Sequence, residues 1–449
     1  MLQKKKGYNI GTKSLQCKLI RNGIELIETR LAYNEVVNFY FALINTYPEH
    51  VLSDDSEYSG WRAYELLSNP GSEFALPFDI PSQLKRSAIR KAIGAWESWN
   101  TSYQKWKDRP NKKKHHRPPV QPRKFNFSPS YDAGVWKDDF DGNILLKIKN
   151  KGQWKWIKFD YQSRSFVHDP TGLNGWHKAS PSIVIKGNKA YLTFSLQKYI
   201  PATGGIKNQL AKNSVRVLGV DMDLDRNIAI LSVLEIDANG VVVEVARHFI
   251  SQSNHTKRRK RRLGRIAIRM QKTGIINKGF CNRRWEQIHN AEREMSRRVA
   301  RRIAHFAHDW KCSVIAFEHL TNLKPCRGKY SRRSNQKRAY WLKSKVFQET
   351  NRIAYQDYGI LTTRVNPRYT SRLDPWNNEL YRINLHSGEV AIRMIHDGKL
   401  EPKYEPGADF VVNPKNCYSA HSGLNAARNI GLKAILRHRT NAVFVLRKA

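Results

Sequence analysis

The spacing of hydrophobic residues along the chain predicts two mixed regions of strands and helices. Residues 12–30 alternate between apolar and polar positions around Asn22-Gly23, a pattern typical of a β-hairpin. From residue 31 the apolar residues recur at helical spacing up to Pro48. A longer helix is predicted to begin at Pro81-Ser82, which supplies its N-cap. One face of that helix is apolar and carries Leu84, Ala88, Ala92, Ala95, Trp99, Tyr103 and Trp106.

The aromatic part of this stripe has two interpretations. Helical spacing of apolar residues favours packing into a core. The alternative is that Trp99 or Trp106 stacks on a nucleic-acid base, because exposed aromatic rings serve as base platforms.

From Phe125 to Leu196 the period is two, with a turn at Gly187-Asn188. This pattern predicts a small antiparallel barrel, and the strands at 12–30 would complete it. The helical segment 31–105 is then an insertion in the barrel.

The second half of the chain begins with three predicted strands in succession, and two further strands follow after a long helix. A helix is predicted at 340–358, residues 373–418 form a small inserted module, and a final helix begins near Leu424. The predicted strands are 215–222, 227–236, 240–250, 313–318 and 361–365.

The charge of the chain indicates what kind of partner it binds. The 449 residues include 79 Lys and Arg against 38 Asp and Glu, a formal net charge of +41. Such an excess repels itself unless a polyanion neutralises it, which indicates nucleic acid. No apolar run approaches the roughly 20 residues needed to span a bilayer, and the N-terminus does not read as a secretory signal. The cysteines are odd in number and lack CxxC spacing, which indicates a reducing cytoplasm.

Several basic segments are predicted to contact phosphates. Six adjacent cations at a helix start are stable together when they meet a phosphate backbone, and a Pro-rich basic linker and one face of the long helix add to them. A solvated surface is the alternative for each segment. The candidates are Lys112, Lys113 and Lys114 in the linker, Lys257, Arg258, Arg259, Lys260, Arg261 and Arg262 in the run, Arg297, Arg298, Arg301 and Arg302 on the long helix, and Arg372.

Two acids stand where strands end. Asp221 closes the apolar run 217–220, and Glu318 ends the strand 313–318. Phosphodiester hydrolysis by two metal ions needs carboxylates that bridge ions roughly 3.5–4 Å apart. An acid that ends a strand is usually only hydrated, which is the alternative for each residue alone. Together, in this order along the predicted strands, the two acids are candidate magnesium ligands.

At this point the sequence resembles the TnpB family of transposon-encoded RNA-guided nucleases, the ancestors of type V CRISPR effectors. The resemblance rests on four motifs. They are Gly219-Val220-Asp221, Ile315-Ala316-Phe317-Glu318-His319-Leu320, Val365-Asn366-Pro367-Arg368-Tyr369-Thr370-Ser371-Arg372 and Leu424-Asn425-Ala426-Ala427-Arg428-Asn429-Ile430.

The resemblance implies an α+β multidomain fold. An RNase H-like (RuvC-like) domain would be split by a small module, and a wedge-type β-barrel would be interrupted by a helical recognition lobe. The expected boundaries are 1–30 and 125–210 for the barrel, 31–124 for the lobe with its basic linker, 211–368 and 419–449 for the RuvC-like domain, and 369–418 for the target-nucleic-acid-binding module.

The resemblance also implies a guide RNA, target double-stranded DNA read by pairing, and magnesium-dependent cutting with Asp221 and Glu318 as catalytic acids. The expected location is the prokaryotic cytoplasm, on the nucleoid when DNA is bound. The family's module often carries four zinc-binding cysteines, whereas here only Cys417 remains in the stretch, so no zinc is expected.

A second departure concerns the third catalytic acid, whose position is Gly423. Three explanations stay open: Asp409 or Asp374 reaches in from the module, His421 or Asn425 holds a metal-bound water, or the site does not cut. The functional hypotheses are therefore an RNA-guided endonuclease, a nuclease-dead RNA-guided DNA-binding protein acting by transcriptional block or partner recruitment, and a guide-independent DNA-binding or DDE-type transposition protein.

Overall fold

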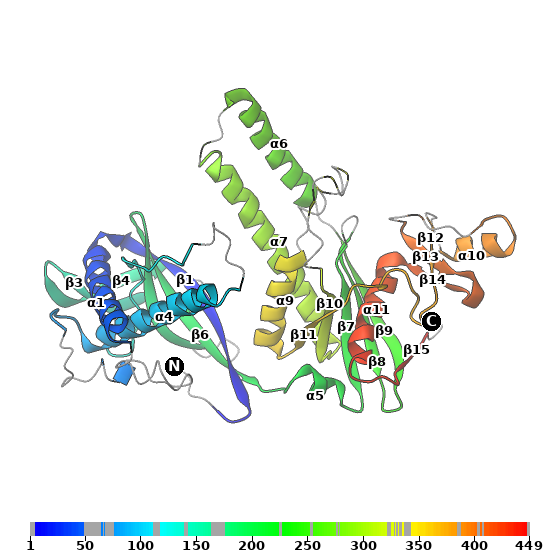
Figure 1. Cartoon of the computed structure of the whole chain (residues 1–449), viewed down its shortest axis with the longest axis horizontal. Coiled ribbons are helices and arrows are strands. Elements are labelled where there is room, and N and C mark those ends of the chain that lie inside the picture. Colours follow the sequence, from blue (N-terminus) through cyan, green and yellow to red (C-terminus); the bar gives the residue numbers. More distant parts are fainter. Residues whose placement is uncertain are drawn as a thin grey trace. The chain divides into compact units, whose positions relative to one another are not determined.

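The computed structural model divides into two compact units, Met1–Tyr199 and Ile200–Ala449. Each unit is described by itself (Figure 1). The structure describes residues 5–48, 64–65, 67, 76–110, 117–138, 142–162, 176–223, 227–251, 255–274, 277, 279–320, 325–326, 328, 331, 335, 343–383, 388–401, 405 and 408–446.

The first unit is built on a six-stranded sheet with the order β2-β3-β4-β1-β6-β5. Just before β2, Ser130 bridges Ser182 of β5, so the chain next to one edge strand pairs with the other edge strand. The strands are β1 Tyr8–Asn22, β2 Trp136–Asp138, β3 Asn143–Asn150, β4 Gln153–Gln162, β5 His177–Lys186 and β6 Lys189–Pro201.

Two helices, α1 (Ile27–Thr46) and α4 (Ser82–Lys107), pack on each other and share one core with the sheet. The hairpin predicted at 12–30 is wrong: β1 ends at Asn22, and Gly23–Leu26 is a 3-10 turn that leads into α1. The helix predicted from Pro81-Ser82 is present, with Pro81 at the cap position and no side-chain cap hydrogen bond.

The apolar stripe of α4 has a buried part, which ends at Ala92, and an outer aromatic part. Leu84, Ala88 and Ala92 are fully buried in the core. Beyond them, the Trp99 and Tyr103 rings stack with centroids 5.5 Å apart, and the Trp99 indole donates a hydrogen bond to the Pro119 carbonyl oxygen at 3.3 Å. The outer aromatic residues therefore pack on each other and on the Pro-rich segment of the same chain.

The second unit contains a six-stranded sheet with the order β11-β10-β7-β8-β9-β15. The first three strands in sequence pair antiparallel, whereas β10 lies parallel to both β7 and β11. The strands are β7 Val215–Asp221, β8 Asn227–Ile236, β9 Val241–Ser251, β10 Val314–Glu318, β11 Leu361–Val365 and β15 Val443–Val445. The five strands predicted for this region are all present.

Alternation along each strand divides the side chains between the two faces of this sheet. Leu218 and Val220 belong to a core with helices α7 (Asn282–Asp309) and α9 (Lys343–Tyr358). Val217 belongs instead to the core with helix α11 (Ser422–Leu436). The sheet is therefore covered by helices on both faces.

Helix α6 (His255–Thr273) is held on α7 by a buried acid. The Glu292 carboxylate of α7 lies 2.5 Å from Arg259 Nη2 of α6 and 2.6 Å from Lys345 Nζ of α9. Burial opposes ionisation of Glu292, but Lys345 and Arg259 outweigh it and lower its pKa. The two long helices form the hairpin that extends beyond the sheet in Figure 1.

The predicted inserted module contains a three-stranded antiparallel sheet in the order β12-β13-β14 and one helix. Its elements are β12 Tyr381–Ile383, α10 Gly388–His396, β13 Phe410–Asn413 and β14 Tyr418–His421. The last strand runs directly into α11. The mixed multidomain fold predicted from the sequence is thereby confirmed, while the exact domain boundaries stay a prediction.

Candidate functional site

Asp221 and Glu318 end adjacent parallel strands, and both side chains project from the sheet face that α11 covers. Val220 pairs with Phe317 in the β7–β10 register, so the two acids come next to each other one position later. On each strand the residues two positions earlier, Gly219 and Ala316, face α11. Alternation therefore puts both carboxylates on the α11 side.

Small residues allow α11 to lie against these strand ends. A Cβ on Gly219 would stand 2.0 Å from the Ala427 carbonyl oxygen and 2.8 Å from the Gly431 backbone nitrogen. Only glycine at position 219 leaves room for the helix backbone at this distance. The motif Gly219-Val220-Asp221 thus packs against the motif that begins at Leu424, and this contact brings α11 close to Asp221 and Glu318.

The start of α11 lies beside Asp221. A Cβ on Gly423 would stand 3.1 Å from Asp221 Oδ2 and 3.5 Å from His421 Nδ1. The same point is only 2.2 Å from Cδ1 of Ile230, a fully buried residue of β8. The place where a side chain at 423 would begin is therefore next to the acid and already filled by an apolar methyl group.

Burial dominates the electrostatics of Asp221. It raises the pKa of the carboxyl well above its ordinary value, and the negative charges of Glu318 and Asp223 raise it further. The Arg382 guanidinium and the Met222 backbone N–H act in the opposite direction. Asp221 therefore lies in an environment that favours a nearby positive charge.

Glu318 is held by the module. The buried Thr370 hydroxyl donates a hydrogen bond to Glu318 Oε1 and lies 2.9 Å from the Pro367 carbonyl oxygen. Burial raises the pKa of Glu318, while the Thr370 hydrogen bond and the nearby Lys433 ammonium lower it. One oxygen of this carboxylate is thus engaged by a neutral hydroxyl.

Two of the predicted substitutes for the third acid are engaged elsewhere. Asp374, 1% exposed, accepts hydrogen bonds from the backbone nitrogens of Trp376 and Asn378 at 2.9 and 2.8 Å, and from side-chain amides of Asn378, Asn413 and Asn416. It therefore closes the loops of the module. Asn425 accepts from the Tyr418 hydroxyl and donates to the Leu373 carbonyl oxygen, each at 2.9 Å, so its amide also has a structural role.

Asp409 and His421 lie closer to Gly423. The Asp409 carbonyl oxygen accepts a hydrogen bond of 2.7 Å from the Ser422 backbone nitrogen. His421 caps α11, since its Nδ1 accepts from the Gly423 backbone nitrogen at 3.2 Å. That ring nitrogen is therefore occupied by the helix start, and a metal-binding role for either residue stays a prediction.

Two charged residues that influence the pKa of Asp221 are not among the candidates predicted from the sequence. Asp223 lies two positions further along the same extended segment, a spacing that puts it on the same side as Asp221. Arg382 lies on β12 of the module, and its Nε is buried without a hydrogen-bond partner among the described residues. Sequence spacing could have identified Asp223, whereas nothing in the sequence connects Arg382 to the strand ends.

At the strand ends the structure brings together two of the three acids that the resemblance implies for a magnesium site. Two carboxylates converge, one of them hydrogen-bonded to Thr370, and Ile230 fills the space for a third. Among the residues that the structure describes, no three His, Cys, Asp or Glu side chains are grouped to hold a metal ion. In the module, Cys417 Sγ lies 3.6 Å from His396 Nε2.

The run of six cations lies on α6, and the helical period separates residues that contact α7 from residues that are exposed. Arg259 faces Glu292, and Arg262 donates to the Gln287 carbonyl oxygen of α7 at 3.2 Å. Four members of the run are exposed, namely Lys257, Arg258, Lys260 and Arg261. The run therefore both attaches α6 to α7 and presents a cationic surface.

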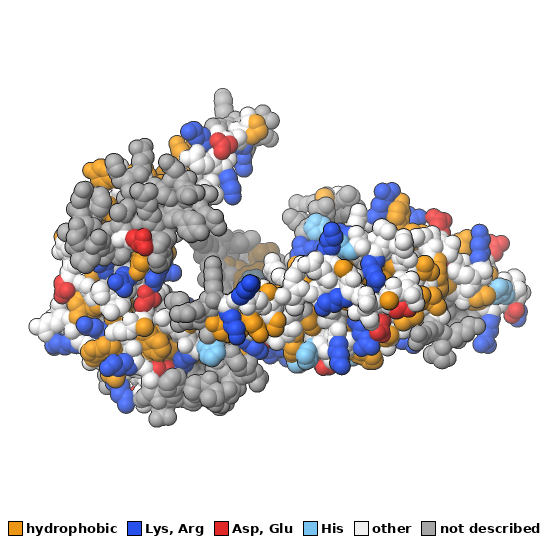
Figure 2. Space-filling view, turned by 90° about the horizontal axis from the view of Figure 1, so that it is seen from below, with side chains coloured by type: hydrophobic (Ala, Val, Ile, Leu, Met, Phe, Trp, Pro, Cys, Tyr) orange, Lys and Arg blue, Asp and Glu red, His pale blue; other side chains and the backbone are white. Residues whose placement is uncertain are grey.

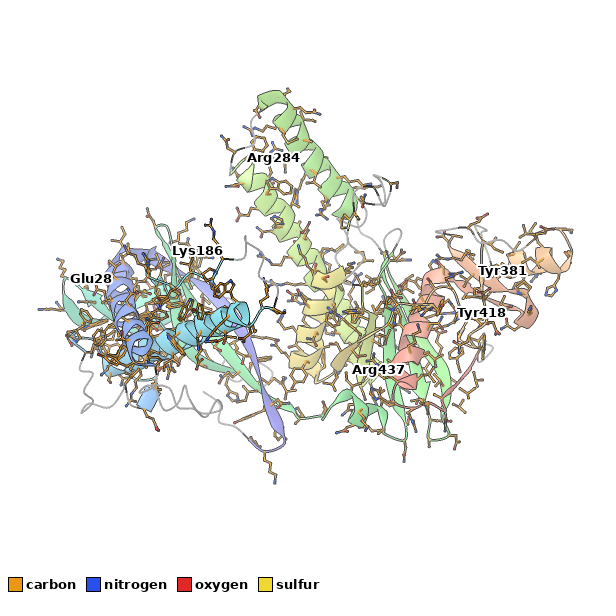
Figure 3. The ribbon with its side chains drawn as sticks, viewed as in Figure 1. Glu28, Lys186, Arg284, Tyr381, Tyr418 and Arg437 are labelled. Carbon is orange, nitrogen blue, oxygen red and sulfur yellow. The ribbon has the colours of Figure 1, made fainter. Side chains whose placement is uncertain are left out.

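The cations of α7 lie on its outer face. An open groove there, about 640 Å³ in volume, is lined by α7 residues including Arg297, Arg298, Arg301 and Arg302. Arg297 pairs with Glu349 and Arg298 with Glu294, while Arg301 and Arg302 are exposed and have no ion-pair partner in the described part of the chain. Figure 3 labels Arg284, in the first turn of the same helix.

The remaining predicted contacts are scattered. Arg372 is exposed at the start of the module, and Lys112, Lys113 and Lys114 lie outside the described residues. Lys and Arg side chains are spread over the face shown in Figure 2. No described helix combines the length and the apolar character that a membrane crossing requires.

The chain is similar in sequence to a TnpB-like protein and in fold to Cas12 effectors. A family model described as the Aq_aa04 family matches residues 13–150. TnpB-like protein aq_aa05 of Aquifex aeolicus (strain VF5) is 22% identical over 209 residues. That alignment covers 43% of this chain and 63% of the relative, so the chain spans less than two thirds of the relative's length.

Two solved structures are similar in fold. The Cas12f1–sgRNA–target DNA complex matches with a TM-score of 0.54 at 12% identity, covering 95% of this chain and 99% of that one. The selenomethionine-derived Cas12i1 R-loop complex before target DNA cleavage matches with a TM-score of 0.50 at 12% identity, covering 93% and 67%. The predicted resemblance to the TnpB family and its type V relatives is thereby confirmed.

Proposed function

We propose that this chain is an RNA-guided DNA-targeting protein that occupies matched DNA without cutting it. The observation that carries the second half of this proposal is the Ile230 methyl group in the space of the third acid. The first half is supported by the fold shared with Cas12 complexes that contain guide RNA and target DNA.

The strand order supports an RNase H-like, RuvC-like domain in the second unit. Three antiparallel strands followed by two parallel ones, β9-β8-β7-β10-β11, give the order that such a domain requires. We assign 211–368 and 419–449 to this domain and 369–418 to the inserted module. In the first unit, the Ser130–Ser182 bridge supports a closed wedge-type barrel formed by 1–30 and 125–210, with the lobe at 31–124.

The charge supports guide RNA and double-stranded DNA as partners. A net charge of +41 and the exposed cations of α6 and α7 suit a duplex that is held through its phosphates, while base pairing reads the sequence. We place such a protein in the prokaryotic cytoplasm, on the nucleoid when it binds DNA.

The absence of a third carboxylate at 423 argues against cleavage. Each 1.36 kcal/mol of lost transition-state stabilisation slows a reaction about tenfold. The loss of one charged ligand from a two-metal site would remove several kcal/mol of this stabilisation, so we expect cutting by Asp221 and Glu318 alone to be very slow. In this proposal magnesium has no catalytic role.

Magnesium-dependent cleavage is the second candidate, and one observation favours it. Burial raises the pKa of Asp221, and the negative charges of Glu318 and Asp223 raise it further, and raised pKa values of this kind are common at functional sites. Cleavage would then use Asp223, Asp409 or His421 in place of the missing acid.

Sequencing the RNA that copurifies with the protein tests the guided function. We expect one enriched, structured RNA, and binding of DNA that matches its variable end but not of scrambled DNA. Bulk RNA of random sequence, with equal binding to matched and scrambled DNA, would instead support a guide-independent DNA-binding transposition protein.

A further inference from the structure

Trp156 of β4 presents its ring on the outward face of the first sheet. Along this strand the buried side chains of Phe159 and Tyr161 alternate with outward ones, and Trp156 is 41% exposed. Two positions earlier, Trp154 packs against the core, and its indole donates a hydrogen bond of 3.0 Å to the Asp79 carbonyl oxygen. The ring of Trp156 is therefore accessible at the surface, whereas that of Trp154 is used within the unit.

Three lysines lie around this ring on the same face. Lys147 of β3 stands directly opposite Trp156 in the antiparallel register, and Lys158 follows two positions along β4. Lys137 of β2 pairs with Leu145, which in turn pairs with Lys158, and directly paired residues share a face of the sheet. The Lys137 Nζ lies 5.5 Å from the centroid of the Trp156 ring, near the outer limit of a cation–π contact.

A hollow of about 150 Å³ lies next to these lysines. Its acid, Asp138, does not cancel their charge, because its carboxylate is buried, pairs with Lys178 and accepts a hydrogen bond of 3.1 Å from the Tyr161 hydroxyl. Asp160 is exposed on the outward face, opposite Asn143. With three lysines beside this one exposed acid, the patch around Trp156 is positively charged. The hollow is lined by Lys137, Asp138, Asn143, Ile144, Leu145 and Lys158.

An exposed aromatic ring among lysines suits an unpaired nucleotide. Any base can stack on such a ring, and the neighbouring ammonium groups bind its phosphates. Bases inside a duplex stack on one another, so only an unpaired base reaches the ring. The alternative is that Trp156 and Lys147 form a cross-strand pair that only stabilises the β3–β4 hairpin. That pair does not account for Lys137, Lys158 and the hollow beside them.

We propose that the outward face of β2, β3 and β4 binds an unpaired segment of RNA, with a base stacked on Trp156 and phosphates held by Lys137, Lys147 and Lys158. This inference rests on the proposed function, in which a guide RNA accompanies the protein before DNA arrives. The displaced DNA strand is the other unpaired strand in that function, and the experiment below separates the two.

Ultraviolet crosslinking of the purified ribonucleoprotein, before any DNA is added, tests this assignment. Mass spectrometry of the digested complex should find a ribonucleotide attached to the peptide that contains residue 156. Crosslinks confined to other parts of the chain would overturn the proposal. A deoxyribonucleotide on this peptide, seen only after matched DNA is added, would overturn it as well, because the face would then bind the displaced strand.

Charge-removing variants that keep the ring separate binding from folding. The double variant Lys137→Gln and Lys158→Gln should lower the crosslink yield at residue 156 several-fold, with an unchanged melting temperature. The matched control is Lys186→Gln with Lys189→Gln, which removes two charges from cross-strand partners on the β5–β6 hairpin of the same unit; Figure 3 labels Lys186. Equal yields in the two double variants would contradict phosphate binding by this face.

Trp156→Leu tests the stacked base directly. Leucine keeps an apolar partner for Lys147 but lacks a flat ring, so binding of a short oligouridine to the RNA-free protein should weaken about tenfold, roughly the contribution of one stacked base. Trp156→Phe should restore most of it, and equal affinities of all three proteins would refute stacking. One enriched copurifying RNA without a crosslink at residue 156 defeats only this inference, whereas copurification of random RNA defeats the proposed function.

Discussion

Ile230 of β8 lies directly opposite Asp221 of β7 in the sheet register, and its Cδ1 fills the space where a side chain at 423 would begin. Both residues project onto the α11 face, and Ile230 packs against Leu424 and Ala427 of that helix. A side chain restored at position 423 would therefore require this buried methyl group to move.

The overlap between Ile230 and the space at position 423 predicts that Ile230→Val changes the free energy of unfolding in opposite directions in two backgrounds. Gly423→Ala should lower the free energy of unfolding by about 1–3 kcal/mol through overpacking. Ile230→Val alone should also destabilise, by about 1 kcal/mol, because it leaves a small cavity. In the Gly423→Ala background, the same Ile230→Val change should stabilise, since it removes the colliding methyl. Urea unfolding of the four proteins measures the coupling, and additive losses would disprove the overlap.

Gly219 provides a stronger steric test. Gly219→Ala sets a methyl group against the α11 backbone at 2.0 Å, where no flexible side chain can yield. We expect a loss of about 3 kcal/mol or an insoluble protein. Gly94→Ala is the control, because this exposed position of α4 has open space and alanine favours helices by about 1 kcal/mol. Similar melting temperatures for the two variants would mean that α11 does not approach β7 so closely.

The exposed cations of α6 should set part of the salt dependence of nucleic-acid binding. Replacing Lys257, Arg258, Lys260 and Arg261 with glutamine should flatten the slope of log K against log salt by about 0.9 for each lost phosphate contact. The control exchanges Lys and Arg at the same four positions and keeps the charge. An unchanged slope in the glutamine variant would make this run a solvated surface.

Glu292 should give the α6–α7 hairpin a pH-dependent stability. Its pKa is lowered in the folded state, so its contribution is complete above the ordinary glutamate pKa of 4.5 and is lost as the pH falls through the lowered value. Glu292→Gln should therefore cost about 2 kcal/mol at pH 7 and much less near pH 3. Thermal unfolding at both pH values measures this, and a pH-independent difference would rule out the ion pairs as its source.

The sequence predicted most of the second unit because its strands are short, apolar and clearly bounded. The sequence also predicted that Asp221 and Glu318 lie together, because acids that end adjacent parallel strands meet at the same end of the sheet. The prediction failed at Asn22-Gly23, where the turn signal is real but leads into a helix that packs on the first sheet. Local alternation could not reveal that tertiary packing.

The surroundings of the acids could not be read from the chain. Gly423 is visible in the sequence, but the methyl group that fills its space comes from Ile230, nearly 200 positions earlier. The sequence presents Asp374 as a candidate substitute acid, whereas in the structure its five hydrogen bonds close the loops of the module. No feature of the sequence pointed to Arg382, because its effect on the pKa of Asp221 depends on how the module lies on the sheet.

The most direct measurement is a plasmid assay with the purified ribonucleoprotein, a matched target and magnesium. We predict a clear gel shift with the plasmid still supercoiled, and the same pattern for Gly423→Ala. A nicked or linear product that depends on the guide, and that Asp221→Ala abolishes, would contradict binding without cleavage.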